Sequence, residues 1–402
     1  MTRNLNTLTN DAENLDRPLF NRDFILITLS SFVFFFNFHS FILLPVRIEE
    51  LGGTEAKIGF IMGMAAMATI ITTPTVGIAI DRFGKKWFLA AGGILMSITT
   101  LPFAYMDTLN YLFPLLRVFQ GAALSLCFVS AGTLIVDASS SAKRSQAIGI
   151  FGIFSIINFA LAPSVGKVFI DYFGFREFFI FDFFFGLMAF IIALFIAEPL
   201  RTKNEELSGN YFSVLFKQGV MIAASALFVA GMGFVTVITF VPVFAGRINV
   251  EQYEIFFITY TFSVIAVRVF GGWIPDKYGK KKASVPAFFV YAASIIALGF
   301  TTNWVGLLVS GILFGLGHGL FYPAIYALVM DLSSEIDRGK AISICSVSFT
   351  FGGMLGVFIY GVVAERWGFP LMFQILGITS IIGFLIFSIF GKEHDKPYIQ
   401  NK

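Results

Sequence analysis

The sequence predicts an all-α membrane protein with twelve transmembrane helices in two parallel six-helix repeats and both termini in the cytoplasm. Of its 402 residues, 57% are hydrophobic and only 13% are charged, whereas a soluble domain carries roughly 25% charged residues. Apolar segments of about 20 residues, each long enough to cross a bilayer as a helix, follow one another along almost the whole chain. A ten-residue pattern also occurs twice, about half a chain length apart, which indicates an internal repeat.

The first six predicted spans form an N-terminal bundle, residues 23–197, after a polar cytoplasmic tail, residues 1–22. Each span is an apolar run bounded by polar or charged residues. The first run is followed by no small-residue cleavage pattern, so we expect no cleaved signal peptide. The six spans are predicted at residues 24–45, 57–80, 87–106, 111–136, 146–169 and 178–197.

The second six spans form a C-terminal bundle, residues 217–391, and they follow the longest polar connection of the chain. That connection, residues 198–216, is interpreted as a cytoplasmic linker, and residues 392–402 as a cytoplasmic tail. The spans are predicted at residues 218–245, 254–274, 284–302, 304–330, 341–364 and 371–390.

The positions of the basic residues predict the orientation. Twenty of the 28 Lys and Arg residues lie in the tails, the linker and the even-numbered loops. Six lie in the odd-numbered loops, and Arg117 and Arg268 lie inside spans. Because basic loops stay in the cytoplasm, both termini are expected there.

The repeated pattern is a glycine, three residues, an aspartate, a base, an aromatic residue, a glycine and two lysines. An aspartate near the carboxyl end of a helix is disfavoured by the helix dipole, so each needs a partner, either a nearby base or the amino terminus of another helix. The two later glycines permit positive φ in a tight turn, and the two earlier ones allow a facing helix to approach closely. One copy could be an ordinary basic loop, whereas two matched copies favour a latch that forms and breaks. The residues assigned to it are Gly77, Asp81, Arg82, Gly84, Lys85, Gly272, Asp276, Lys277, Gly279 and Lys280.

Two further pairs repeat at a spacing of 194 residues and extend the duplication beyond the loops. Asp137 and Arg144 match Asp331 and Arg338. We expect these pairs to form a charge relay with the repeated pattern and to act in gating.

The repeated loop between spans two and three, and again between eight and nine, resembles the signature loop of the major facilitator superfamily, in the style of its drug:proton antiporter or efflux branch. The resemblance covers nearly the whole chain: twelve spans, two halves and a central linker. It implies two halves that enclose a cavity and expose it alternately to the two sides. It also implies that Asp81 and Asp276 help to close the cytoplasmic side.

The second family-like motif is Leu116-Arg117-Val118-Phe119-Gln120-Gly121 in span four. Arg117 lies about two turns inside an apolar helix, where an ionisable side chain is costly and suggests function. Gln120 lies one turn away on the same face. In proton-coupled members of the family the matching arginine is associated with coupling. The alternative is that Arg117 reaches the outer interface or braces span one.

The remaining polar residues inside spans are candidates for gating, coupling or substrate contact. Arg268 is expected to pair with a cytoplasmic carboxylate and to act in gating. Asp182, in span six, is expected to reach the outer interface. Each histidine is alternatively a packing residue, and Asn158 departs from the glycine-rich pattern that the family's antiporters show in span five. The candidates for coupling or substrate contact, besides Arg117 and Gln120, are Asn37, His39, Asn158, His318, Tyr322 and Tyr326.

The sequence contains no metal-ligand spacing, no nucleophile with a base and no nucleotide-binding loop, so we expect no enzyme, no metal and no cofactor. Cys127 and Cys345 lie in apolar segments, which disfavours a disulfide. The leading hypothesis is a monomeric secondary active transporter in a bacterial inner membrane, driven by the proton motive force. It would export a small, largely uncharged or apolar compound, with the lipid bilayer and this substrate as partners and no nucleic acid. The alternatives are an uptake permease for a sugar or other metabolite, and a lipid-handling or sensor protein on the same scaffold.

Overall fold

The computed structural model describes residues 18–140, 142–198, 214–334 and 337–391, and this part of the chain is helical without β-strands. Eleven of its helices are long and apolar enough to cross a membrane. The expected all-α membrane architecture is therefore confirmed. The predicted tails and most of the predicted linker, residues 1–17, 199–213 and 392–402, lie outside the described residues.

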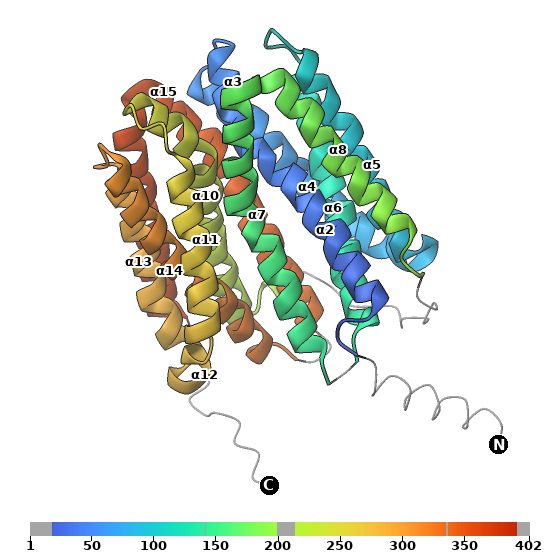
Figure 1. Ribbon diagram of the computed structural model, residues 1–402. Coiled ribbons are helices and arrows are strands. Elements are labelled where there is room, and N and C mark those ends of the chain that lie inside the picture. The colour runs from blue at the N-terminus through green and yellow to red at the C-terminus, as the bar shows by residue number, and fades with distance from the viewer. Residues whose placement is uncertain (1–17, 141, 199–213, 335–336, 392–402) are drawn as a thin grey trace, which may run out of the picture. The chain divides into compact units, whose positions relative to one another are not determined.

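The chain divides into two compact units, of which the first comprises Met1–Leu44 and Met67–Glu205. Within it, α2 packs against α6, α7 and α8, and α5 packs against α6 and α8. Figure 1 shows these helices in blue to green. The helices and short 3₁₀ turns of unit 1 are α2 (Arg22–Ser40), η1 (Phe41–Leu43), the later part of α4 (Glu55–Phe83), α5 (Lys85–Thr100), η2 (Leu101–Tyr105), α6 (Leu112–Ala138), α7 (Arg144–Phe173) and α8 (Phe175–Leu194).

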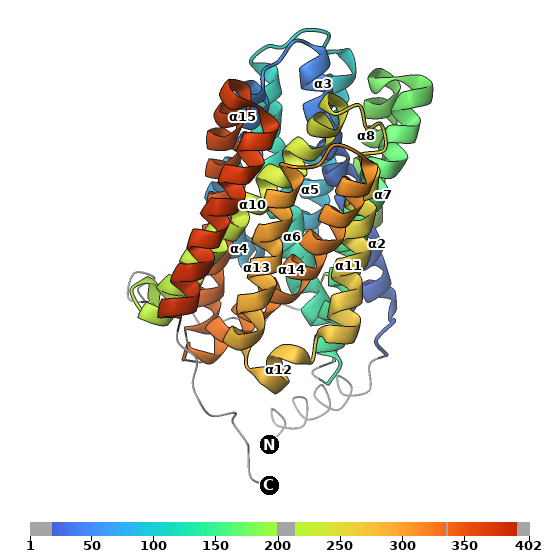
Figure 2. The ribbon, with the colours of Figure 1, turned by 90° about the vertical axis from the view of Figure 1, so that its left-hand side faces the viewer.

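Unit 2 comprises Pro45–Ala66 and Glu206–Lys402. It differs from the expected C-terminal bundle because it includes most of α3 (Leu44–Glu50) and the beginning of α4. Within it, α10 packs against α15, and α14 packs against both α11 and α13, an arrangement visible in Figure 2. Its other helices are α10 (Gln218–Arg247), α11 (Glu254–Gly271), α12 (Ile274–Tyr278), α13 (Lys280–Leu298), α14 (Trp304–Asp331) and α15 (Arg338–Phe390).

The last helix, α15, contains both of the last two predicted spans in one 53-residue run. Gly368 interrupts it with φ 82° and ψ 162°, backbone angles that only glycine adopts without strain. Pro370 follows two residues later and also disfavours a straight continuation. The two predicted spans, 341–364 and 371–390, therefore lie on either side of this break.

Close helix packing in each unit depends on small residues. In unit 1, a Cβ added to Gly93 of α5 would lie 2.7 Å from the backbone nitrogen of Phe190 in α8. In unit 2, a Cβ on Gly231 of α10 would lie 1.9 Å from the carbonyl oxygen of Phe349 in α15. These distances are too short for any side chain, so backbone-to-backbone contact holds both helix pairs, as is common in membrane proteins.

Candidate functional site

The first copy of the repeated pattern forms a tight turn between α4 and α5. α4 ends at Phe83, and Gly84 has φ 103° before α5 begins at Lys85. This confirms the expected positive φ of the glycine. Asp81 lies in the last turn of α4, with its side chain outside the described part of the structure, and Arg82 is exposed over the Phe83 ring at 5.3 Å.

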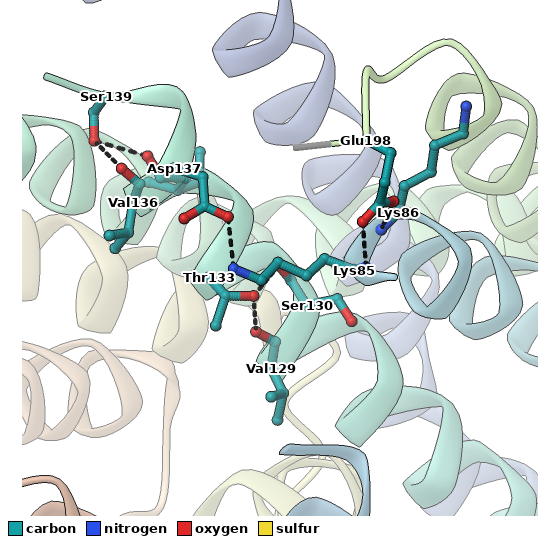
Figure 3. A network of polar contacts seen from close by, with 10 residues as sticks. Lys85, Lys86, Val129, Ser130, Thr133, Val136, Asp137, Ser139 and Glu198 are labelled. Atoms are coloured by element: carbon teal, nitrogen blue, oxygen red, sulfur yellow. Dashed lines mark hydrogen bonds and ion pairs between the residues drawn. The ribbon is translucent and has the colours of Figure 1, made fainter. Parts of the chain in front are cut away.

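A carboxylate from elsewhere in unit 1 occupies the amino terminus of α5. The Glu198 oxygens accept hydrogen bonds from the backbone N–H groups of Lys85, at 2.8 Å, and Lys86, at 2.9 Å (Figure 3). The first N–H groups of a helix have no partner within the helix, and an anion there is favoured by the helix dipole. Glu198 follows α8, so it ties the end of the sixth predicted span to the start of the third. No spacing pattern in the sequence pointed to it.

The Lys85 side chain extends from the same turn to the end of α6. Its Nζ lies 2.6 Å from Oδ2 of Asp137 (Figure 3). The ammonium group thereby approaches the carboxyl end of α6, where a cation is favoured. Arg144, the expected relay partner of Asp137, begins α7 and forms no ion pair with it among the described residues.

The second copy repeats this contact in unit 2. Gly279 has φ 102°, and the Lys280 Nζ pairs with Oδ2 of Asp331 at the end of α14. Arg338 donates from Nε to the Met330 carbonyl oxygen at 3.3 Å rather than to Asp331. Duplicated sequence positions therefore make the same lysine–aspartate contact in both units.

The expectation that Asp276 ends a helix is wrong. In the second copy α11 ends at Gly271, and Asp276 lies in the first turn of the separate five-residue helix α12, seen between α11 and α13 in Figure 2. The cause is Pro275, whose missing N–H and ring interrupt a continuous helix but suit a first turn. Lys277 extends over the rings of Trp273, at 5.1 Å, and Tyr278, at 5.3 Å.

The expected close approach of a facing helix at Gly77 and Gly272 is also wrong. A Cβ added to Gly77 would meet no described atom within 4 Å. At Gly272 it would meet only the carbonyl group of Arg268, one turn earlier in the same segment. In this structure neither glycine is required by packing against another helix.

A further ion pair lies beside the second copy, outside the spans. The Lys217 Nζ is 2.7 Å from Oδ2 of Asp337, and the Ser334 hydroxyl donates to the same oxygen at 2.9 Å. The hydrogen bond from Lys217 is the main reason why the pKa of the Asp337 carboxyl group falls to about 2. The contact joins the residues that precede α10 and α15.

Arg117 lies in α6 and is only 4% exposed. Its Nη1 donates to the Gln120 side-chain oxygen at 2.7 Å, and its guanidinium lies over the rings of Phe41, at 5.4 Å, and Phe38, at 5.9 Å. Both rings come from the first predicted span, so Arg117 is buried against that span and does not reach an outer interface. The arginine and glutamine predicted to share a face do contact each other.

Three other candidates in unit 1 are tied to backbone carbonyl groups. The Asn37 side-chain N–H donates to Asp182 O at 2.5 Å, and the Asn158 side-chain N–H donates to Phe32 O at 3.0 Å. The His39 Nδ1 lies 2.8 Å from Phe35 O. All three side chains are buried, and the two asparagine contacts join α2 to α8 and α7.

Asp182 does not reach an interface, contrary to expectation, because it is fully buried. Neither of its carboxylate oxygens has a hydrogen-bond partner among the described residues. Ser40 has a single hydroxyl proton, and it donates that proton to Phe36 O at 3.0 Å. Asp182 is thus a buried acid without a cation, on the helix whose backbone holds Asn37.

In unit 2, Arg268 and His318 lie in one aromatic cluster with Tyr260, Tyr322 and Tyr326. The Tyr260 hydroxyl is 3.1 Å from Nδ1 of His318, and the Tyr322 hydroxyl donates to the Tyr326 hydroxyl at 3.4 Å. Arg268 lies near Tyr260 and Tyr322 in this cluster. No carboxylate pairs with Arg268 in the described part of the chain, which does not include the side chain of Asp81, so the expected pairing stays a prediction.

Sequence reasoning missed an ion-pair cluster at one end of unit 2. The Arg247 Nε donates to Glu49 at 2.6 Å, and its Nη2 donates to Glu55 at 3.1 Å. Nearby, the backbone N–H of Ala56 donates to Glu365 at 3.2 Å. The only available signal was that these charges occur at the ends of apolar runs, which does not predict pairing.

Beside this cluster, the beginning of α4 is in backbone contact with α15, and we call the contact the α4–α15 seam. A Cβ on Gly59 would lie 2.1 Å from Val357 O, and one on Gly63 would lie 2.0 Å from the Phe358 ring. A Cβ on Gly361 would lie 2.7 Å from Glu55 O. The seam and its ion pairs hold Pro45–Ala66 within unit 2.

The fold and these contacts define a polytopic α-helical membrane protein with duplicated charged turns and buried charges inside its spans. The family model described as Major Facilitator Superfamily matches residues 25–258 and 247–401. The chain therefore belongs to the major facilitator superfamily, a family of transporters. This confirms the resemblance and accounts for the transmembrane helices and the role in transport rather than in enzymatic catalysis.

Related proteins have different names and cargoes. The chain is 24% identical to an uncharacterized MFS-type transporter of Methanocaldococcus jannaschii, over 85% of this chain and 90% of that protein. It is also 24% identical to the staphylopine export protein of Staphylococcus aureus, over 89% and 92% of the two chains. The synaptic vesicular amine transporter of Mus musculus is 24% identical over 84% of this chain and 67% of its own.

Solved structures share the fold. A variant of the nucleoside transporter NupG has a TM-score of 0.78 at 16% identity, over 92% of this chain and all of that one. A bacterial homologue of the human lysosomal transporter Spinster, in an inward-facing and unoccupied conformation, has a TM-score of 0.77 at 15% identity, over 94% and 98%. At these identities the likeness concerns the fold alone.

Proposed function

We propose that this protein is a proton-coupled secondary active transporter that works by alternating access and exports a small compound whose body is largely uncharged or apolar. The observation that carries the proposal is the contact between lysine and aspartate that recurs at matched positions, Lys85 with Asp137 and Lys280 with Asp331. Each pair links a charged turn to the end of another helix in its own unit. Such exposed pairs are weak, about 0–1 kcal/mol, so they can form and break during a cycle.

The α4–α15 seam supports alternating access on the opposite side. In the proposed topology the termini and the duplicated turns are cytoplasmic, and the break at Gly368 separates an eleventh and a twelfth span. The Arg247 cluster and the seam then lie on the outer side, where the start of α4 would leave and rejoin α15 as the transporter cycles. The proposed domains are residues 23–197 and 217–391, joined by a linker at 198–216, in a monomer of the bacterial inner membrane.

Export in exchange for protons is supported by the few charges inside the spans and by the names of two relatives, an export protein and an amine transporter. The test is accumulation of substrate in cells or vesicles with and without a protonophore. We expect net transport to stop when the proton gradient is dissipated. Unchanged accumulation would contradict the proposal.

The alternative is uptake of a metabolite by symport or facilitation, which the likeness to nucleoside transporter structures fits equally well. In that case adding substrate would make the external medium more alkaline if protons enter with it. Export by antiport moves protons inward only when the substrate is loaded inside. The direction of the pH change after loading each side in turn therefore separates the two functions.

A further inference from the structure

Arg268 is a cation in the last turn of α11. Its buried Nε has no hydrogen-bond partner, and it forms no ion pair with an acid in the described part of the chain. Arginine stays charged in proteins, and a cation inside a membrane segment is costly unless it is paired. By contrast, Lys85 and Lys280 each contact a carboxylate. The missing partner of Arg268 is therefore the feature to explain.

A stripe of glycines on α14 places this arginine against polar aromatic side chains. A Cβ on Gly315 would lie 2.5 Å from Tyr260 O, and one on Gly319 would lie 3.1 Å from the Val264 Cα, both atoms of α11. Figure 2 shows α11 and α14 next to each other. The backbones of α11 and α14 are in contact along these glycines. The side chains beside the glycines on the two helices therefore lie close together.

His318 is the central side chain of this space and also has an unused polar atom. It is 7% exposed, its Nδ1 lies 3.1 Å from the Tyr260 hydroxyl, and its Nε2 has no partner in the described structure. Its ring stacks on Phe234, with centroids 4.7 Å apart and an interplanar angle of 22°. It interacts electrostatically with Arg268. An imidazole nitrogen without a partner beside a lone guanidinium indicates a place for a polar ligand group.

Aromatic rings make up the rest of the surroundings. Tyr322 has its ring 5.1 Å from that of His318, and Phe349 lies 5.2 Å from Tyr322. The Tyr322 hydroxyl donates to the Tyr326 hydroxyl at 3.4 Å. Rings of this kind present faces and edges to a planar apolar ligand. In the described part of the chain no carboxylate forms an ion pair or a hydrogen bond with these side chains, which disfavours a cationic ligand group.

We propose that Arg268, together with His318, binds the carboxylate of an organic acid that has a planar apolar body. The guanidinium presents several N–H donors in a fork that matches a carboxylate, and the rings contact the ligand body. This inference rests on the proposed function, because the bound acid is taken to be the transported compound. It narrows the cargo to compounds with an apolar body and one acidic group.

The experiment uses the purified full chain in detergent and three ligands that share one ring system. They are indole-3-acetate, indole-3-acetamide and tryptamine, which carry a negative, a neutral and a positive group at neutral pH. Isothermal titration calorimetry gives the dissociation constant of each. Because a hydrogen bond to a charged group contributes about 1.5–3 kcal/mol, we expect the acetate to bind at least about tenfold more tightly than the acetamide.

Three variants separate binding from a merely structural role. Arg268→Gln should abolish the preference for acetate over acetamide, and Arg268→Lys should restore part of it. His318→Phe removes the ring nitrogen that has no partner and should weaken acetate binding more than acetamide binding. Arg366→Gln removes one exposed positive charge and should leave the ratio of acetate affinity to acetamide affinity as it is in the wild type. A purely structural arginine would lower the affinity for all three ligands together.

Four results would overturn the inference. The first two are that tryptamine binds most tightly of the three ligands, or that Arg268→Gln keeps the wild-type ratio of acetate affinity to acetamide affinity. The other two are that the variants lose affinity equally for all three ligands, or that the wild type does not bind the acetate at millimolar concentration. If Arg268→Gln does not fold, the acetate-to-acetamide ratios of Arg268→Lys and His318→Phe decide the question. The titration involves no proton gradient, so its failure leaves proton-coupled export standing, and failure of the protonophore test leaves the anion site standing.

Discussion

Gly59 offers the sharpest test of the α4–α15 seam. A Cβ at this position would lie 2.1 Å from Val357 O, whereas ordinary contact begins at 3.4 Å. In Gly59→Ala the two helices must therefore separate by about 1.3 Å or deform. Overpacking of a tight contact costs about 1–3 kcal/mol. If only the closed seam bears that cost, the ratio of open to closed molecules rises by a factor of about 5–150.

The assay measures how fast a cysteine buried in the seam reacts with a membrane-impermeant maleimide added from outside. Val357→Cys places the thiol at a position that is 0% exposed, and the native Cys127 and Cys345 are both buried, which keeps the background low. We expect labelling at least about fivefold faster when Gly59→Ala is added. Gly132→Ala is the matched control, because its Cβ would meet no described atom within 4 Å. Equal labelling rates with and without Gly59→Ala would refute the reasoning.

Three other predictions concern charged side chains. For the pair of Lys85 and Asp137, a double-mutant cycle with Lys85→Gln and Asp137→Asn should give a coupling free energy of about 0.2–1 kcal/mol in thermal unfolding. Each variant should also transport more slowly. A coupling free energy of zero would show that the pair has no role in gating. Asp182→Asn should be at least as stable as the wild type in a thermal-shift assay, because an amide of the same size replaces a buried carboxyl group that has no partner among the described residues and is costly to ionise there. A large loss of stability would show a charged partner. Because the Asp337 pKa is lowered to about 2, its contact with Lys217 stabilises the folded state above the ordinary Asp pKa of about 3.9 and is lost as the pH falls through 2. The difference in stability between the wild type and Lys217→Gln should therefore stay constant from pH 7 to 5 and shrink below pH 4, and a constant difference down to pH 2 would contradict it.

The helical architecture could be predicted because it depends on composition and length. Apolar runs must form helices in a bilayer, since every backbone polar group needs an internal partner. The turns at Gly84 and Gly279 were also predictable, because positive φ strongly favours glycine. The contact between Arg117 and Gln120 follows from helical spacing alone.

Most contacts that the sequence did not predict have a different cause, since they depend on which helix neighbours which. Nothing local indicates that Glu198 meets the start of α5, that Arg247 meets Glu55, or that Arg268 lies among aromatic side chains. The placement of Asp276 failed for a local reason, because Pro275 was not recognised as the start of a new helix. A proline one residue before an aspartate was the signal that would have predicted it.

The membership of α4 in both units limits how the molecule can move. The boundary between Ala66 and Met67 lies inside a continuous helix, so the chain crosses from one unit to the other there as well as after Leu44 and after Glu205. Covalent bonds do not stretch, and a displacement of one unit relative to the other must bend α4 or peel its first turns away from unit 2. Pro74, a few residues beyond the boundary, lacks an N–H and leaves one backbone hydrogen bond unmade. α4 therefore limits the range of any such movement, and it bends most easily at that proline.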